Sequence, residues 1–97
     1  LGEKLPAAKA LDWGLVNRVV ADADLMPSAL ALANELAAGP TKTLALIRRL
    51  AWQSEDAAWQ AQLTAERVAQ REAGRTEDFA EGVKAFLTKR PAKFSGS

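Results

Sequence analysis

The stretch from Arg75 to Phe94 reads RTEDFAEGVKAFLTKRPAKF and is the most informative part of the chain. Thr76 can cap a helix through its hydroxyl, and the acidic residues after it favour the positive end of the helix dipole. Pro91 ends the helix, because the residue before a proline is driven out of the helical region. Apolar residues share one helical face by their spacing: Phe79, Val83, Phe86 and Leu87. The stretch predicts an amphipathic helix with a cationic end.

Phe86 and Lys89 lie three residues apart, so the expected helix presents the ring and the ammonium on the same side. This pair suits a nucleotide, whose base can pack on the ring while a phosphate lies near the amine. The residues alone also allow a simpler interpretation, in which Phe86 belongs to the core. Lys89, Arg90 and Lys93 then form a solvated cluster of charge at the helix end.

Composition favours helix, since Ala, Leu, Glu, Gln, Arg and Lys are abundant, and 97 residues make one domain at most. Thirteen basic and twelve acidic side chains give a net charge of +1, which is too balanced for a surface that attracts nucleic acid. The chain has no Cys and no His, which excludes disulfides, histidine metal sites and imidazole catalysis. We therefore expect no metal site and no nucleic-acid partner.

No window approaches the ~18 apolar residues of a membrane-spanning helix, and the first residues lack the basic start and apolar run of a signal peptide. We expect a cytoplasmic protein with no membrane partner. The chain opens on Leu1 rather than Met, within what reads as a structured segment. We interpret it as a fragment of a longer polypeptide.

The spacing and capping signals predict helices over about residues 6–13, 25–38, 41–52, 55–73 and 76–90. The segment Leu15–Val20 is short and rich in β-branched residues, so it predicts a strand. A lone strand has no partners for its backbone donors and acceptors, so it needs an edge from elsewhere. The predicted fold is an all-α fragment of four to five helices plus one short strand.

Two single residues carry further expectations about local structure. Ser54 is expected to cap the helix over residues 55–73. Gly82 lies in the middle of the last helix, where glycine costs about 1 kcal/mol relative to alanine. We interpret Gly82 as a point where another backbone approaches closely.

The last helix resembles the C-terminal helix of the enoyl-CoA hydratase/isomerase (crotonase) family. The resemblance rests on Arg75-Thr76, Asp78-Phe79, Glu81-Gly82-Val83, Ala85-Phe86, Lys89-Arg90-Pro91 and Phe94. In that family an aromatic residue and a lysine in this context reach the adenine and phosphate end of coenzyme A bound in an adjacent subunit. The resemblance implies that Phe86 and Lys89 bind coenzyme A.

The start of the chain is similar to the same family. The pattern LGEKLPA at residues 1–7, followed by Trp13-Gly14-Leu15-Val16, looks like the end of the family's spiral ββα core. The family usually has Ser or Thr before this helix, whereas the chain has Leu5-Pro6. This difference affects the capping of the helix more than the assignment of the segment to the family. The resemblance implies that residues 1–21 end the spiral core of a crotonase-like α/β fold. Residues 22–97 are then a C-terminal helical lid and trimerisation domain.

The resemblance extends over the whole chain and corresponds to the last third of a family subunit. In the family, the catalytic carboxylates and the backbone oxyanion hole lie upstream of this region, so it implies no catalytic residue here and an inactive fragment. The implied parent acts on a coenzyme A thioester through an enolate, needs no cofactor, and forms a trimer or a dimer of trimers. Ala61-Gln62-Leu63, Glu66-Arg67 and Ala73-Gly74-Arg75 look most like the ring-epoxide phenylacetyl-CoA isomerases of phenylacetate degradation.

Three other interpretations stay open. A helical oligomerisation module without a ligand accounts for the wide apolar surface of Thr41–Trp52 and for Gly82. A nucleic-acid-binding domain would use Lys89, Arg90 and Lys93, although the near-neutral charge argues against it. The parent is alternatively a plain enoyl-CoA hydratase. Only carboxylates upstream of this region distinguish hydration from isomerisation.

Overall fold

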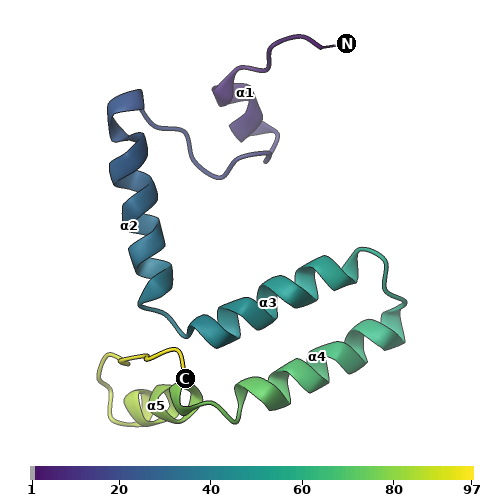
Figure 1. Ribbon diagram of the computed structural model, residues 1–97, viewed down its shortest axis with the longest axis vertical. Coiled ribbons are helices and arrows are strands. Elements are labelled where there is room, and N and C mark those ends of the chain that lie inside the picture. Colours follow the sequence, from purple (N-terminus) through teal and green to yellow (C-terminus); the bar gives the residue numbers. More distant parts are fainter. Residues whose placement is uncertain (1) are drawn as a thin grey trace. The chain divides into compact units, whose positions relative to one another are not determined.

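The computed structural model describes residues 2–97, which form helices joined by turns (Figure 1). The helices are α1 (Ala7–Asp12), the 3₁₀ turn η1 (Asp22–Asp24), α2 (Leu25–Ala37), α3 (Thr41–Ser54), α4 (Trp59–Ala73) and α5 (Glu77–Leu87). None of the described residues lies in a β-strand. The predicted all-α class, with five α-helices, is confirmed.

The chain divides into two compact units, Leu1–Leu32 and Ala33–Ser97. In the first unit, α1 ends in a turn at Gly14, whose φ of +72° lies in the left-handed region. The N–H of Gly14 donates to the Leu11 carbonyl and that of Leu15 donates to the Ala10 carbonyl, both at 2.9 Å. These two bonds form a Schellman motif, in which glycine is the usual left-handed residue.

The segment Leu15–Val20 is not a strand, so this part of the predicted fold is wrong for the described chain. Its first N–H belongs to the cap of α1 rather than to a ladder, and the Leu15 side chain is 65% exposed. A run of β-branched residues forms a strand only when the edge of another strand pairs with its backbone N–H and C=O groups. Residues 2–97 provide no such edge.

In the second unit, α3 and α4 pack side by side as a helical hairpin (Figure 1). The buried apolar side chains are Leu46 of α3, Ala69 of α4 and Ala85 of α5. Two of these three are alanines, whose small side chains allow the helices to approach closely. The core that positions α5 is therefore small.

The connection between α3 and α4 differs from the expected one. α3 continues to Ser54, and α4 begins only at Trp59. The Ser54 hydroxyl donates to the Ala51 carbonyl at 2.7 Å, so it closes the last turn of α3 and does not cap α4. Serine hydroxyls commonly bond to the carbonyl three or four residues earlier, and Ser54 makes this bond in place of the expected cap of α4.

Gly82 in α5 faces a side chain and not a second backbone, which corrects the sequence-based interpretation. A Cβ atom at this position would lie 3.7 Å from Cε1 of Phe94, and no backbone atom is closer. That separation is an ordinary van der Waals contact. The site therefore has room for one methyl group.

We expect the Gly82→Ala variant to be more stable than the parent chain by up to about 1 kcal/mol, because alanine loses less backbone entropy in a helix interior. Urea unfolding measures the difference. A loss of stability would show instead that the space beside Phe94 is filled in the folded protein.

Candidate functional site

The N-terminus of α5 is capped as the sequence predicts. The Phe79 N–H donates to the Thr76 hydroxyl oxygen at 3.0 Å, and the Thr76 hydroxyl donates to the Ala73 carbonyl at 2.7 Å. Glu77 and Asp78 occupy the first turn, where negative charge interacts favourably with the helix dipole. This cap fixes the residue at which α5 starts.

The C-terminus of α5 differs from the expected one. The helix ends at Leu87, so Lys89 lies outside it and the three-residue helical spacing from Phe86 does not apply. Instead, the Lys89 N–H donates to the Phe86 carbonyl at 3.2 Å, and the Arg90 N–H donates to the Ala85 carbonyl at 3.1 Å. This is a Schellman motif, which satisfies the last carbonyls before the proline. The two predicted binding residues are thus linked through a turn.

Lys89 occupies a backbone conformation that lysine adopts at a cost. Its φ is +52°, in the left-handed region. At the equivalent position in the cap of α1, the chain has Gly14. A side chain in this region costs about 1 to 2 kcal/mol, and such residues are concentrated at functional sites, where the surrounding structure holds them.

The apolar stripe of α5 faces outward in the second unit. Phe86 is 82% exposed and Leu87 is 73% exposed, whereas Asp78 and Ala85 are each 2% exposed. Within residues 2–97, Phe86 therefore does not pack into a core. The stripe borders an apolar groove of about 420 Å³, lined by Pro40, Thr43, Ala73, Asp78, Phe79, Gly82, Val83, Phe86, Leu87 and Phe94.

Glu81, one turn after Asp78, forms a two-point ion pair with Arg90. The Arg90 Nη1 and Nη2 atoms donate to the two Glu81 carboxylate oxygens at 2.6 and 2.7 Å. The Lys93 N–H donates to the same carboxylate at 2.8 Å. By contrast, the ammonium groups of Lys89 and Lys93 have no carboxylate partner within the described residues. Both are therefore available to a ligand, and only Lys89 lies in the turn that follows Phe86.

These bonds lower the pKa of Glu81 to about 2, mainly through the Arg90 side chain and secondly through the Lys93 N–H. The same bond to Glu81 raises the pKa of Arg90. Because the folded-state pKa of Glu81 is depressed, its stabilising contribution is present above the unfolded-state value of ~4.3 and fades as the pH falls toward 2. The interaction is intact at neutral pH.

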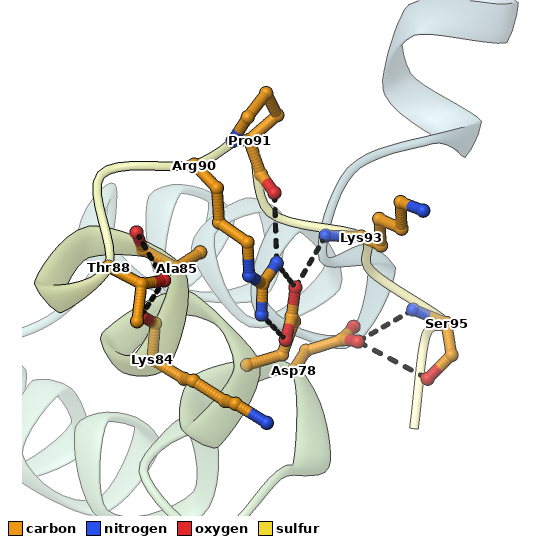
Figure 2. A network of polar contacts seen from close by, with 9 residues as sticks. Asp78, Lys84, Ala85, Thr88, Arg90, Pro91, Lys93 and Ser95 are labelled. Carbon is orange, nitrogen blue, oxygen red and sulfur yellow. Dashed lines mark hydrogen bonds and ion pairs between the residues drawn. The ribbon is translucent and has the colours of Figure 1, made fainter.

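Asp78 anchors the C-terminal strap, which we define as residues 91–97. Its side chain is buried, and its Oδ1 accepts from the Ser95 N–H at 2.7 Å and from the Ser95 hydroxyl at 3.3 Å (Figure 2). Its Oδ2 accepts from the Gly96 N–H at 2.9 Å, and its own N–H donates to the Ser97 carbonyl at 3.2 Å. The strap is thereby fixed against α5, with Phe94 beside Gly82.

Sequence spacing does not predict this network. By spacing alone, Asp78 and Glu81 are expected to interact with the helix dipole, because local spacing shows nothing of partners 9 to 18 residues farther along. The signal that was available is the spacing itself: two acids three residues apart lie on one side of a helix. Only the path of the strap shows what they bind.

The described residues offer no metal centre. Among residues 2–97, no group of three acidic, histidine or cysteine side chains is placed to hold a metal ion. Over the same part of the chain, no helix combines the length and the apolar character needed to cross a membrane. The features that remain for a ligand are the apolar groove, the exposed Phe86 ring and the Lys89 ammonium in the turn that follows it.

A sequence model described as enoyl-CoA hydratase/isomerase matches residues 1–97. A 1,2-epoxyphenylacetyl-CoA isomerase of Escherichia coli K12 is 44% identical over 99% of this chain and 37% of the relative. A trans-2-decenoyl-acyl-carrier-protein isomerase of Streptococcus mutans is 36% identical over 98% of this chain and 36% of the relative. A solved enoyl-CoA hydratase structure from Geobacillus kaustophilus has a TM-score of 0.94 and 34% identity, over 99% of this chain and 37% of that one.

The chain thus spans little more than a third of the length of the relatives it matches. The matched part is the C-terminal third of the solved structures. Its helical fold is shared with them.

Proposed function

Because this chain belongs to the enoyl-CoA hydratase/isomerase family, we propose that it supplies the coenzyme A contact of an enzyme that isomerises or hydrates acyl-CoA thioesters. One observation carries the proposal. Phe86 is 82% exposed at an apolar groove, and its carbonyl accepts the N–H of Lys89, whose ammonium lacks a carboxylate partner in the described chain. An exposed ring and a cation joined by one turn of backbone suit an adenine next to a phosphate.

The turn after α5 makes this helix C-terminus more favourable for an anion than a helix C-terminus usually is. The last carbonyls of a helix carry partial negative charge and repel phosphate. Here the Ala85 and Phe86 carbonyls accept backbone N–H groups, and Lys89 brings a positive charge to the same turn. The ammonium therefore makes this helix end suitable for a phosphate.

The rest of the reaction belongs to parts of the enzyme outside these 97 residues. We propose that residues 1–21 complete the core and that residues 22–97 form a lid and a trimerisation domain. In the parent, preorganised backbone donors would stabilise the thioester oxygen as it gains charge. The isomerase relative, at 44% identity, supports a ring-epoxide phenylacetyl-CoA as substrate. The hydratase structure, at 34% identity, makes hydration of an enoyl-CoA the second candidate.

Exposed apolar side chains support a homo-oligomeric parent, a trimer or a dimer of trimers. In the second unit, Trp52 is 64% exposed and Trp59 is 73% exposed. Large exposed apolar residues of this kind mark protein interfaces. Experiments on the coenzyme A contact therefore need the assembled protein as its gene encodes it.

We expect the Phe86→Ala variant of that protein to bind coenzyme A about tenfold more weakly, because stacking of a base on an aromatic ring contributes about 1 to 3 kcal/mol. Isothermal titration calorimetry measures the Kd. Pantetheine, which lacks the adenine and the phosphates, should bind the variant and the parent equally.

A matched control separates this contact from general effects. Lys93→Ala removes the same charge as Lys89→Ala from the same cluster. We expect Lys89→Ala to weaken binding and Lys93→Ala to leave it nearly unchanged. Unchanged affinity in both Phe86→Ala and Lys89→Ala would refute the proposed contact.

A further inference from the structure

We propose that Glu81 is a positioning residue for the Lys89 ammonium, acting through Arg90 and the strap. The inference rests on the proposed function, since it concerns how the coenzyme A contact is held in place. It assigns Glu81 no contact with the ligand. Its role is to hold the chain on the C-terminal side of Lys89.

The contacts of Glu81 lie directly after Lys89 in the chain. Arg90, the next residue, binds both carboxylate oxygens at 2.6 and 2.7 Å. The Arg90 Nη1 atom also donates to the Pro91 carbonyl at 3.0 Å, and the Lys93 N–H donates to Glu81 at 2.8 Å. One carboxylate thus holds the side chain of residue 90 and the backbone of residue 93.

The left-handed backbone of Lys89 gives this support a role. A residue with φ of +52° is held at a cost, so bonds to its neighbours stabilise it. The Lys89 N–H donates to the Phe86 carbonyl, and on the C-terminal side the Arg90 N–H donates to the Ala85 carbonyl. Glu81 adds a second set of contacts on that side, with the Arg90 guanidinium and the Lys93 N–H. Together these bonds keep the Cα of Lys89 in one place, which fixes the point from which its side chain reaches the ligand.

Asp78 supplies a second anchor on the same face of α5. It accepts the N–H groups of Ser95 and Gly96. The residue before them, Phe94, lines the groove together with Phe86. The strap that begins at the Glu81 contacts therefore also brings a wall of the groove into place.

The Glu81 interaction differs from an ordinary surface ion pair, which contributes little. The pair between Arg49 and Glu72 is of that ordinary kind, with one contact of 3.3 Å and side chains that are 50% and 58% exposed. The Glu81 side chain is 22% exposed and accepts three hydrogen bonds. Glu72 therefore provides a matched control.

The test is a double-mutant cycle on the gene-encoded protein, with coenzyme A as the probe. We expect Glu81→Gln to weaken binding about fivefold to tenfold and to leave pantetheine binding unchanged. In a Lys89→Ala background, Glu81→Gln should cause no further loss, because its effect passes through the ammonium. Arg90→Gln, which breaks the same pair from the other side, should reproduce the result, and Glu72→Gln should have no effect.

The outcomes separate this inference from the proposed function. If Lys89→Ala itself leaves the Kd unchanged, the Lys89 part of the coenzyme A contact is refuted and the role of Glu81 falls with it. If Lys89→Ala weakens binding but Glu81→Gln and Arg90→Gln do not, only the positioning role is refuted. Additive losses in the double variant would also refute it, because Glu81 would then act independently of Lys89.

Discussion

Replacing Asp78 with alanine is expected to lower the free energy of unfolding by about 3 kcal/mol. The carboxylate is 2% exposed and accepts two backbone N–H groups and one hydroxyl from the strap. Its removal leaves donors of Ser95 and Gly96 without their partner, and hydrogen bonds to a charged group are stronger than neutral ones. Urea unfolding measures the loss, and hydrogen exchange of the Ser95 and Gly96 amides should show that the strap is released.

Glu77→Ala is the matched control for this change. Glu77 is the neighbouring acid in the same first turn, but it is exposed, and its contact with the strap is a single bond of 3.2 Å with the Ser97 hydroxyl. We expect it to cost less than about 1 kcal/mol. Equal losses for the two variants would mean that Asp78 acts only through the helix dipole.

Replacing Lys89 with glycine is expected to move stability and binding in opposite directions. The free energy of unfolding should rise by about 1 kcal/mol, because glycine adopts the left-handed region without a steric cost. The affinity for coenzyme A should fall about tenfold with the loss of a phosphate contact. Urea unfolding and calorimetry on the same samples measure the two effects.

Lys89→Ala and Gly14→Ala distinguish the backbone effect from the charge effect. Alanine at position 89 removes the ammonium but keeps a Cβ at φ of +52°, so it should weaken binding with little change in stability. Gly14→Ala makes the reverse exchange in the equivalent turn after α1, and should lower stability by about 1 kcal/mol. If Lys89→Gly gains no stability, the left-handed turn is not strained.

Local sequence signals predicted most of the helices correctly because those signals act within a few residues. The Thr76 cap, the start of α3 after Pro40 and the end of α4 before Gly74 all follow from groups close together in the chain. The errors lie where two local signals compete. Ser54 closes α3 by bonding backward, and the turn at Lys89 ends α5 before its expected cationic last turn.

The candidate site was only partly predictable from the sequence. The motif identified Phe86 and Lys89 as candidates, and their contact with coenzyme A remains a prediction. The spacing used to join them was that of a helix, whereas the structure links them through a Schellman turn. The roles of Asp78 and Glu81 could not be predicted, because their partners are brought to them by the path of the strap.

By itself, the sequence determined the helical class, the Thr76 cap and the membership in the family, since each depends on residue types at short, regular spacings. Only the tertiary structure decided three further features. These are that Leu15–Val20 forms no strand, that the apolar stripe of α5 faces outward, and that two carboxylates hold the strap. Each depends on whether a group far away in the sequence contacts the residue, and on which group that is. Helix periodicity specifies which side chains share a face, but it does not specify what that face contacts.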